Sequence, residues 1–157
     1  MSGHGRRTIV DETRVLDSFA VLALLGGEPG GEEVARFLQQ AQEGEGHLLM
    51  TWVNVGEVAY IVERRWGKER LHRVLATLEA TALEVVPVGR ELALAAAHFK
   101  AEHPLAYADA FAAALAAKAE ATLVTGDPQF RLLKDTIHIH WLPRSEQNAA
   151  SSGASPS

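Results

Sequence analysis

Short apolar runs alternate with helical patterns along this chain, and this alternation restricts the possible folds more than any other feature of the sequence. The runs at 13–18, 47–51, 83–88 and 122–127 have the length and apolar content of buried strands. One or two segments with helical periodicity separate each run from the next. Strands connected through helices form a parallel sheet with right-handed crossovers and helices on its faces. We therefore predict an α/β fold, with three α/β/α layers around a mostly parallel sheet of four or five strands.

Capping residues, glycines and a proline mark where the helices begin and end. Thr51 is a favourable N-cap for the helix predicted over 52–66, and Pro104 separates two helical segments in the region 90–121. The alternating segment 137–142 predicts an edge strand. The remaining predicted helices lie at 19–25, 32–42 and 68–80.

Composition supports one compact domain without disulfides. The chain has 157 residues, of which 47% are hydrophobic, and it contains no cysteine. We expect a flexible leader at 1–12, a folded domain at 13–142 and a disordered, low-complexity tail at 143–157. Neither a signal peptide nor an apolar run of membrane-spanning length is apparent, so we expect a soluble, cytoplasmic protein. The net charge of −5 argues against a broad polyanion-binding surface.

Four acidic residues fall where a parallel sheet would bring them together. Asp17 ends the first predicted strand, Asp127 follows the strand at 122–125, and Glu57 lies in the second turn of the helix after 47–51. Asp109 lies near the start of the helix that precedes 122–125. The carboxyl ends of parallel strands share one edge, where open α/β sheets bind their ligands. Clustered carboxylates without basic partners require protonation or a cation, and Mg²⁺ prefers such oxygen ligands.

Each acid also has an ordinary structural explanation. Asp17 could be an N-cap, Asp127 before a proline could be a turn residue, and Asp109 could favour the positive end of its helix. Glu57 could be a solvated residue beside an apolar stripe. The alanines that follow Asp109, at 112, 113 and 116, instead suggest a helix face that opens on a cleft. Only the occurrence of all four acids together favours a catalytic or metal-binding role over these structural explanations.

Four sequence motifs resemble the successive acidic motifs of PIN-domain ribonucleases, especially the VapC-type toxins of type II toxin–antitoxin systems. The motifs are VLDS at 15–18, NVGEVAY at 54–60, YADAFAAALA at 107–116 and TLVTGDPQF at 122–130. The resemblance implies a PIN-like fold and RNA cleavage that depends on Mg²⁺ or Mn²⁺. It implies catalytic and metal-binding roles for Asp17, Glu57, Asp109 and Asp127, with hydroxyl support from Ser18 and Thr125. It further implies a small cognate antitoxin and a homodimer.

Basic and aromatic residues give weaker indications. Arg64, Arg65, Lys68 and Arg131 flank the predicted acidic pocket and are candidates for RNA contacts, although a solvated helix end explains each cluster taken singly slightly better. We expect Trp52, Trp66 and Trp141 to be packing or interface anchors, and His138 and His140 to lie on a solvated face. The apolar segments at 19–25 and 34–40 could form a groove for the antitoxin.

Other functions of acidic α/β folds fit less well. A phosphatase of the haloacid dehalogenase type needs a second aspartate two residues after the first, where this chain has Phe19. A phosphoacceptor receiver domain needs an aspartate after its third strand, and the segment VVPVGR has none. The alternative to a nuclease is a catalytically silent PIN-like module that binds RNA or protein.

Overall fold

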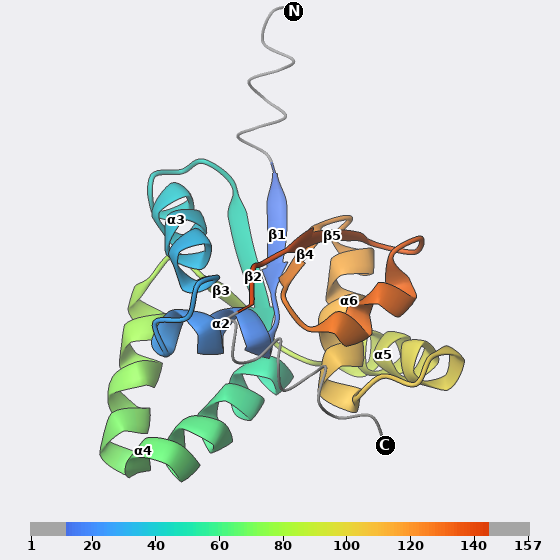
Figure 1. Ribbon diagram of the computed structural model, residues 1–157. Helices are drawn as coiled ribbons and strands as arrows, with labels where there is room; N and C mark the ends of the chain where they lie inside the picture. The colour runs from blue at the N-terminus through green and yellow to red at the C-terminus, as the bar shows by residue number, and fades with distance from the viewer. Residues whose placement is uncertain (1–11, 145–157) are drawn as a thin grey trace, which may run out of the picture.

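The computed structural model describes residues 12–144 and confirms the three-layer α/β/α fold (Figure 1). All strand pairs are parallel, and the order across the sheet is β3-β2-β1-β4-β5. Both edge strands, β3 and β5, are short. Of the predicted leader and tail, only residues 12, 143 and 144 are among those described. The strands are β1 (Thr13–Leu16), β2 (His47–Thr51), β3 (Glu84–Val86), β4 (Thr122–Thr125) and β5 (His138–Trp141).

The helices divide between the two faces of the sheet. Alternate strand residues face opposite sides, so that Leu16 packs on one core and its neighbour Val15 on the other. The first core also receives α2 (Ser18–Leu25), α3 (Gly31–Gln42) and α4 (Trp52–Ala80). The second receives α5 (Arg90–Glu102), α6 (Tyr107–Lys118) and the 3-10 helix η1 (Pro128–Leu133). Burial on both faces explains why the strands read as continuous apolar runs.

Helix α4 joins the two helices that were predicted at 52–66 and 68–80. Gly67 at the junction has a φ of 88°, a left-handed conformation that glycine adopts without a Cβ clash, and the helix bends there. Figure 1 shows the resulting bent arm at the lower left. Among residues 12–144, no helix, α4 included, is both long and apolar enough to cross a membrane.

The alanines of α6 serve packing instead of opening a cleft. Ala112, Ala113 and Ala116 are at most 1% exposed and belong to the core that α6 forms with α5 and the sheet. Small side chains allow a helix to approach its neighbours closely, so this stripe brings α6 against β1 and α5. The sequence interpretation of this face was therefore wrong. Asp109 owes its access to solvent to its position in the first turn, where the helix begins at the sheet edge.

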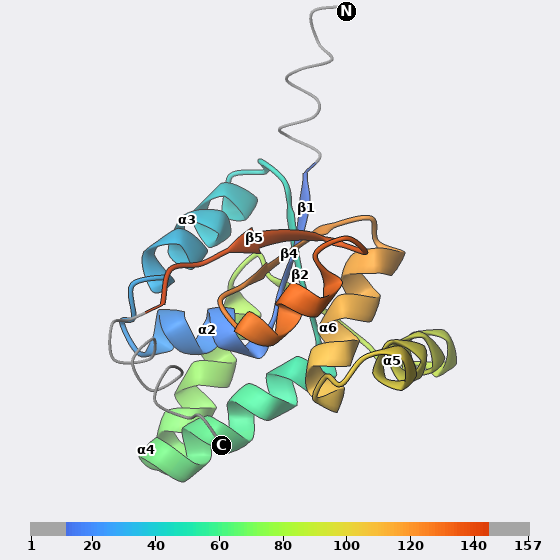
Figure 2. The ribbon, with the colours of Figure 1, turned by 45° about the vertical axis from the view of Figure 1, so that its right-hand side comes forward.

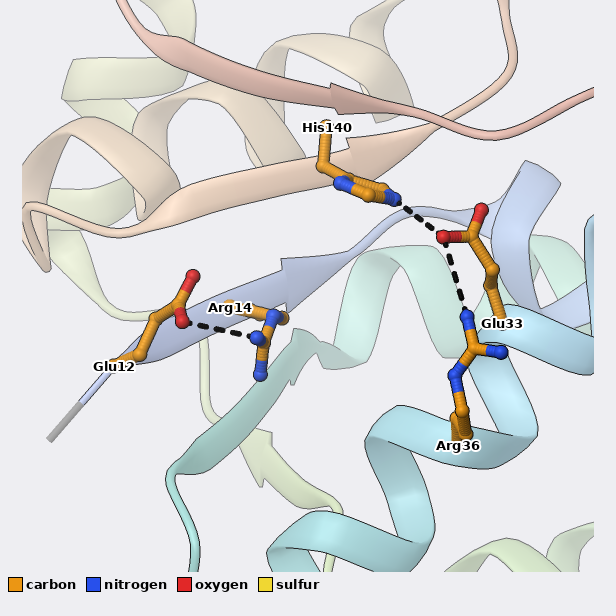
Figure 3. A network of polar contacts seen from close by, with 5 residues as sticks. All are labelled: Glu12, Arg14, Glu33, Arg36 and His140. Carbon is orange, nitrogen blue, oxygen red and sulfur yellow. Dashed lines mark hydrogen bonds and ion pairs between the residues drawn. The ribbon is translucent and has the colours of Figure 1, made fainter. Parts of the chain in front are cut away.

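A polar network ties α3 to the edge strand β5 (Figure 3). The Nε2 atom of His140 lies 3.0 Å from Oε2 of Glu33, and the His140 ring packs edge-on against Phe37. The guanidinium of Arg14 stacks on the same Phe37 ring, 4.1 Å from its centroid. His140 is thus half-buried and partnered, which corrects the expectation of a solvated face, whereas His138 is exposed.

Candidate active site

The starts of four helices meet at the carboxyl edge of the sheet and enclose an acidic pocket. Figure 2 shows α2, α4, α6 and η1 converging there. The pocket has a volume of about 300 Å³. All four acids that the sequence singled out line it, together with six other residues: Ser18, Phe19, Leu22, Ile61, Ala106 and Gln129. We call this cavity the acid pocket.

Asp17 is the most deeply buried of the four acids. Its side chain caps α2, because Oδ1 accepts a hydrogen bond from the backbone N–H of Ala20 at 2.9 Å. The Thr125 hydroxyl donates to the other oxygen, Oδ2. Burial raises the pKa of Asp17 to about 8, although these two hydrogen bonds oppose the shift, and the charges of Asp109 and Asp127 raise it further. Ionised Asp17 therefore needs more positive charge than the fold provides.

Thr125 couples Asp17 to the loop that carries Asp127. Its hydroxyl oxygen accepts the backbone N–H of Asp127 at 3.0 Å while its hydrogen points to Asp17. Asp127 in turn caps η1 by accepting the N–H of Gln129 at 3.0 Å. This capping explains why η1, which the sequence analysis did not predict, starts at Pro128. Thr125 thus holds two acidic segments at one edge.

Asp109 differs from Asp17 in having no hydrogen-bond donor among residues 12–144. It lies in the first turn of α6 and is only 8% exposed. Burial raises its pKa to about 7, and the negative charges of Asp127 and Glu57 add to the shift. A carboxylate in this setting is an available ligand, since neither of its oxygens is committed to a donor of the described fold.

Glu57 lies on α4 at the rim of the acid pocket and is partly exposed. Ile61, one turn further along α4, also lines the pocket, so this face of the helix forms one wall. The wall places Glu57 opposite the first turn of α6, where it acts electrostatically on Asp109.

The donor chemistry of the acid pocket fits a divalent cation held partly by water. All four acids offer hard oxygen donors, which suit Mg²⁺ and Mn²⁺. Within residues 12–144, however, no group of three or more histidine, aspartate or glutamate side chains is close enough to form a preassembled metal site. Mg²⁺ commonly takes only one or two carboxylates and keeps several waters. The arrangement therefore matches an open site and not a closed protein cage.

Asn54 is a buried residue that the sequence analysis did not single out. Its Nδ2 donates to the carbonyl of Ala108 at 3.0 Å, directly before Asp109, and its Oδ1 accepts from the Thr51 hydroxyl at 2.6 Å. Ser18 exchanges hydrogen bonds with Asn54 and forms none with a carboxylate of the described residues. Asn54 thus ties together the starts of α2, α4 and α6. The sequence signal that could have identified Asn54 is its position as a polar residue beside the apolar stripe of α4.

Replacing Asn54 with alanine is expected to lower the free energy of unfolding by about 2–4 kcal/mol, because buried partners lose their hydrogen bonds and a cavity opens. Urea denaturation measures the change. Ser18→Ala is the matched control, since it keeps the bond between Asn54 and Ala108, and it should cost less than about 1 kcal/mol. Equal losses in the two variants would contradict the bridging role of Asn54.

The basic candidates lie outside the acid pocket. Arg64, Arg65 and Lys68 are exposed, and none of them forms an ion pair within the described region. Arg64 stacks on Tyr60, with its guanidinium 5.2 Å from the ring centroid. Helical spacing places Arg64 on the same face of α4 as Glu57, two turns further out. Arg131 lies on η1, beside a different pocket.

A larger cavity, of about 800 Å³, lies away from the acids between β3, α5 and α6. Its floor is apolar, and Lys118 and Glu91 pair across its rim at 3.0 Å. We place the candidate active site in the smaller acid pocket, because within residues 12–144 it is there that carboxylates with raised pKa values meet at the sheet edge.

The fold is shared with solved structures of toxin–antitoxin proteins. A chain of VapBC2 from Rickettsia felis, bound to a promoter DNA fragment, has a TM-score of 0.65 and 16% identity, covering 83% of this chain and 99% of its own. DNA-bound VapBC from Salmonella typhimurium has a TM-score of 0.65 and 19% identity, and the match covers 82% of this chain and 97% of the VapBC chain. VapC20 of Mycobacterium tuberculosis, a Sarcin-Ricin loop cleaving toxin, has a TM-score of 0.60 and 20% identity, and the match covers 76% of this chain and 93% of the VapC20 chain.

These identities are low, so the solved structures establish a common fold and nothing more about this chain. No curated protein sequence matches it significantly. The family assignment comes from the sequence itself, because residues 14–135 match the PIN domain profile. That segment begins in β1 and ends after η1, and it includes all four acids of the acid pocket. The chain therefore belongs to the PIN domain family.

Proposed function

We propose that this protein is a divalent-metal-dependent ribonuclease that serves as the toxin of a toxin–antitoxin pair. One observation carries the proposal. Asp109 is nearly buried and has no hydrogen-bond donor in the described region. It lines a small pocket together with three other acidic residues, and no basic residue of the described region lines that pocket. Folding places these charges together at a cost in free energy, which a bound cation would offset. Membership of the PIN family and the likeness to VapBC folds support the nuclease assignment.

Asp17 and Asp109 are the residues we assign to direct metal binding. Asp17 is fixed in orientation by Thr125 and by its capping bond to Ala20, and Asp109 is fixed through the bond from Asn54 to Ala108. A bound Mg²⁺ or Mn²⁺ would supply a water of lowered pKa and stabilise charge on the leaving oxygen. Two well-positioned ligands leave room for the phosphate of the substrate.

Glu57 and Asp127 act from the rim of the acid pocket in this proposal. Both are partly exposed, so they are placed to hold a water molecule and accept its proton. Arg64, Arg65 and Lys68 continue outward from Glu57 along α4, where they would meet the phosphates of a bound strand. These flanking cations would offset the repulsion between the carboxylates of the acid pocket and the phosphates of the RNA.

The antitoxin partner fits the groove between α2 and α3. This groove has a volume of about 540 Å³, apolar contributions from Leu24 and Ala35, and acidic residues at Glu28 and Glu32. Gly31 allows the two helices to approach, since a Cβ there would lie 2.7 Å from the carbonyl oxygen of Ala23. We propose that a basic, amphipathic segment of the antitoxin lies here. Homodimer formation stays a prediction.

Incubation of the purified full chain with total cellular RNA tests the nuclease proposal. Discrete fragments are expected with Mg²⁺ or Mn²⁺ and not with EDTA, because cleavage needs the cation that Asp17 and Asp109 hold. Asp17→Asn should remove the activity while preserving the capping bond, since asparagine also caps helices. No cleavage with either metal by folded, antitoxin-free protein would favour the binding-module alternative.

A further inference from the structure

A second pocket, of about 330 Å³, lies beside the acid pocket and has the opposite chemical character. Residues from η1, from the end of β5 and from the segments around them line it: Gly126, Pro128, Arg131, Lys134, Trp141, Leu142 and Arg144. Three of these residues are cations, and no acidic residue of the described chain lines the cavity. We call it the Trp141 pocket.

The loop after β4 separates the two pockets and belongs to both. Alternate residues of this loop face opposite sides. Asp127 and Gln129 line the acid pocket, whereas Gly126 and Pro128 line the Trp141 pocket. On the acid side, Phe19 packs so closely on Gly126 that a Cβ there would lie 2.3 Å from the ring. The two pockets therefore share the wall that this loop and Phe19 form, and a ligand in one pocket lies close to the other.

Trp141 offers an accessible ring amid these cations. The residue is 41% exposed at the end of edge strand β5. Arg131 and Lys134 are exposed and form no ion pair within residues 12–144. An exposed aromatic ring beside uncommitted cations is the combination with which proteins bind single-stranded nucleic acid, by stacking a base and neutralising a phosphate. From the sequence we expected Trp141 to be a packing or interface anchor, because no basic residues alternate with it along the chain.

We propose that the Trp141 pocket binds a nucleotide of single-stranded RNA next to the cleaved bond, with the base stacked on Trp141 and a phosphate on Arg131 and Lys134. This inference rests on the proposed function, since it assigns part of the substrate to a second pocket. An acidic protein segment would use the cations but would leave the aromatic ring without a stacking partner. The shared loop also favours RNA, because one strand can enter both pockets.

Binding of a fluorescein-labelled oligouridylate of about 12 nucleotides tests the proposal, measured by anisotropy with the full chain in EDTA. EDTA suppresses cleavage, so affinity is read without turnover. Trp141→Ala should weaken binding by about 5- to 100-fold, because stacking on one aromatic side chain has that effect, and Trp141→Phe should restore most of the affinity. Lys134→Ala should reduce the slope of log affinity against log salt by about 0.7, as expected for one phosphate contact on a single strand.

Trp66→Ala is the matched control. Trp66 is 40% exposed and also lies beside arginines, Arg65 and Arg70, but it is on the opposite side of α4 from Glu57. Its affinity for the oligouridylate should fall far less than that of Trp141→Ala, because Trp66 contacts a proposed phosphate-binding residue, Arg65, but lies outside the Trp141 pocket. The proposal is overturned if Trp141→Ala binds as the wild type does, or if Trp66→Ala loses as much affinity as Trp141→Ala.

The two proposals fail separately. Metal-dependent cleavage of RNA with no effect of Trp141→Ala on affinity would keep the nuclease and remove the nucleotide pocket. Binding that depends on Trp141 without cleavage under any metal would keep the pocket and remove the nuclease. Displacement of the oligouridylate by polyglutamate, with equal affinity for the peptide in Trp141→Ala, would assign the pocket to an acidic protein partner and overturn the RNA assignment.

Discussion

Asp109→Asn is expected to abolish metal-dependent RNA cleavage and, at the same time, to stabilise the metal-free protein. Activity should fall by more than about 100-fold, because changes to groups that merely support a metal ligand already cost 10- to 100-fold. The free energy of unfolding in EDTA at about pH 8 should rise by about 2–4 kcal/mol, since the variant no longer buries a charge whose pKa is raised to about 7. Fragment analysis of RNA and urea denaturation measure the two effects.

Asp135→Asn is the matched control for this experiment. It makes the same chemical change at an exposed aspartate just after η1, outside the acid pocket. Both activity and stability should stay at wild-type values. An Asp109→Asn protein that cleaves RNA at the wild-type rate would remove Asp109 from the metal site, and one that is less stable than the wild type would show that its carboxylate is structural.

The metal-free protein is expected to lose stability as the pH rises from about 5 to about 9. The reference pKa of both aspartates is 3.8, whereas in the fold Asp17 titrates near 8 and Asp109 near 7. Between these values the folded state binds more protons than the unfolded state, so the free energy of unfolding falls with pH, by up to about 1.4 kcal/mol per pH unit for each group. The stability that these two protons contribute is fully present below the pKa of the unfolded state. It is lost as the pH rises through the pKa of the folded state.

Thermal unfolding in EDTA across this pH range measures the effect. The double variant Asp17→Asn/Asp109→Asn is the control, and its stability should vary much less because neither asparagine titrates. Addition of Mg²⁺ to the wild type at about pH 8 should raise the melting temperature, since a ligand that binds only the folded state stabilises it. A wild-type profile as flat as that of the double variant would contradict the raised pKa values.

The structural and chemical explanations of the acids turned out to be compatible. Asp17 caps α2 and Asp109 lies in a first helical turn, as their ordinary interpretations predicted, whereas Asp127, interpreted as a turn residue, caps η1. The same positions at helix starts bring these carboxylates to the carboxyl edge of the sheet. Helix N-termini favour negative charge, so a cluster of them provides a scaffold on which several acids are tolerated together. Capping and a candidate chemical role therefore coexist in the same residues.

Sequence alone determined the layers, the parallel sheet and the family of acidic motifs. Strand and helix periodicities are local, and parallel connections allow few topologies, so alternation of the segments was sufficient. Glu57 was also identified from its position after a predicted strand and Thr125 from the family resemblance, although their roles stay proposals. The short helix η1 was missed because six residues carry too little periodicity to be distinguished from a turn.

Tertiary structure decided what surrounds each of these residues. Only the packing of α2, α4 and α6 revealed that Asn54 bridges three helix starts and that the alanines after Asp109 are core residues. Only the placement of β5 beside η1 brought Trp141 to Arg131 and Lys134. Such contacts join segments that are distant in the chain, and burial shifts a pKa only once the neighbouring layers are in place. A single sequence specifies the residues that meet at the sheet edge, whereas the distances and desolvation that decide their chemistry arise from the assembled layers.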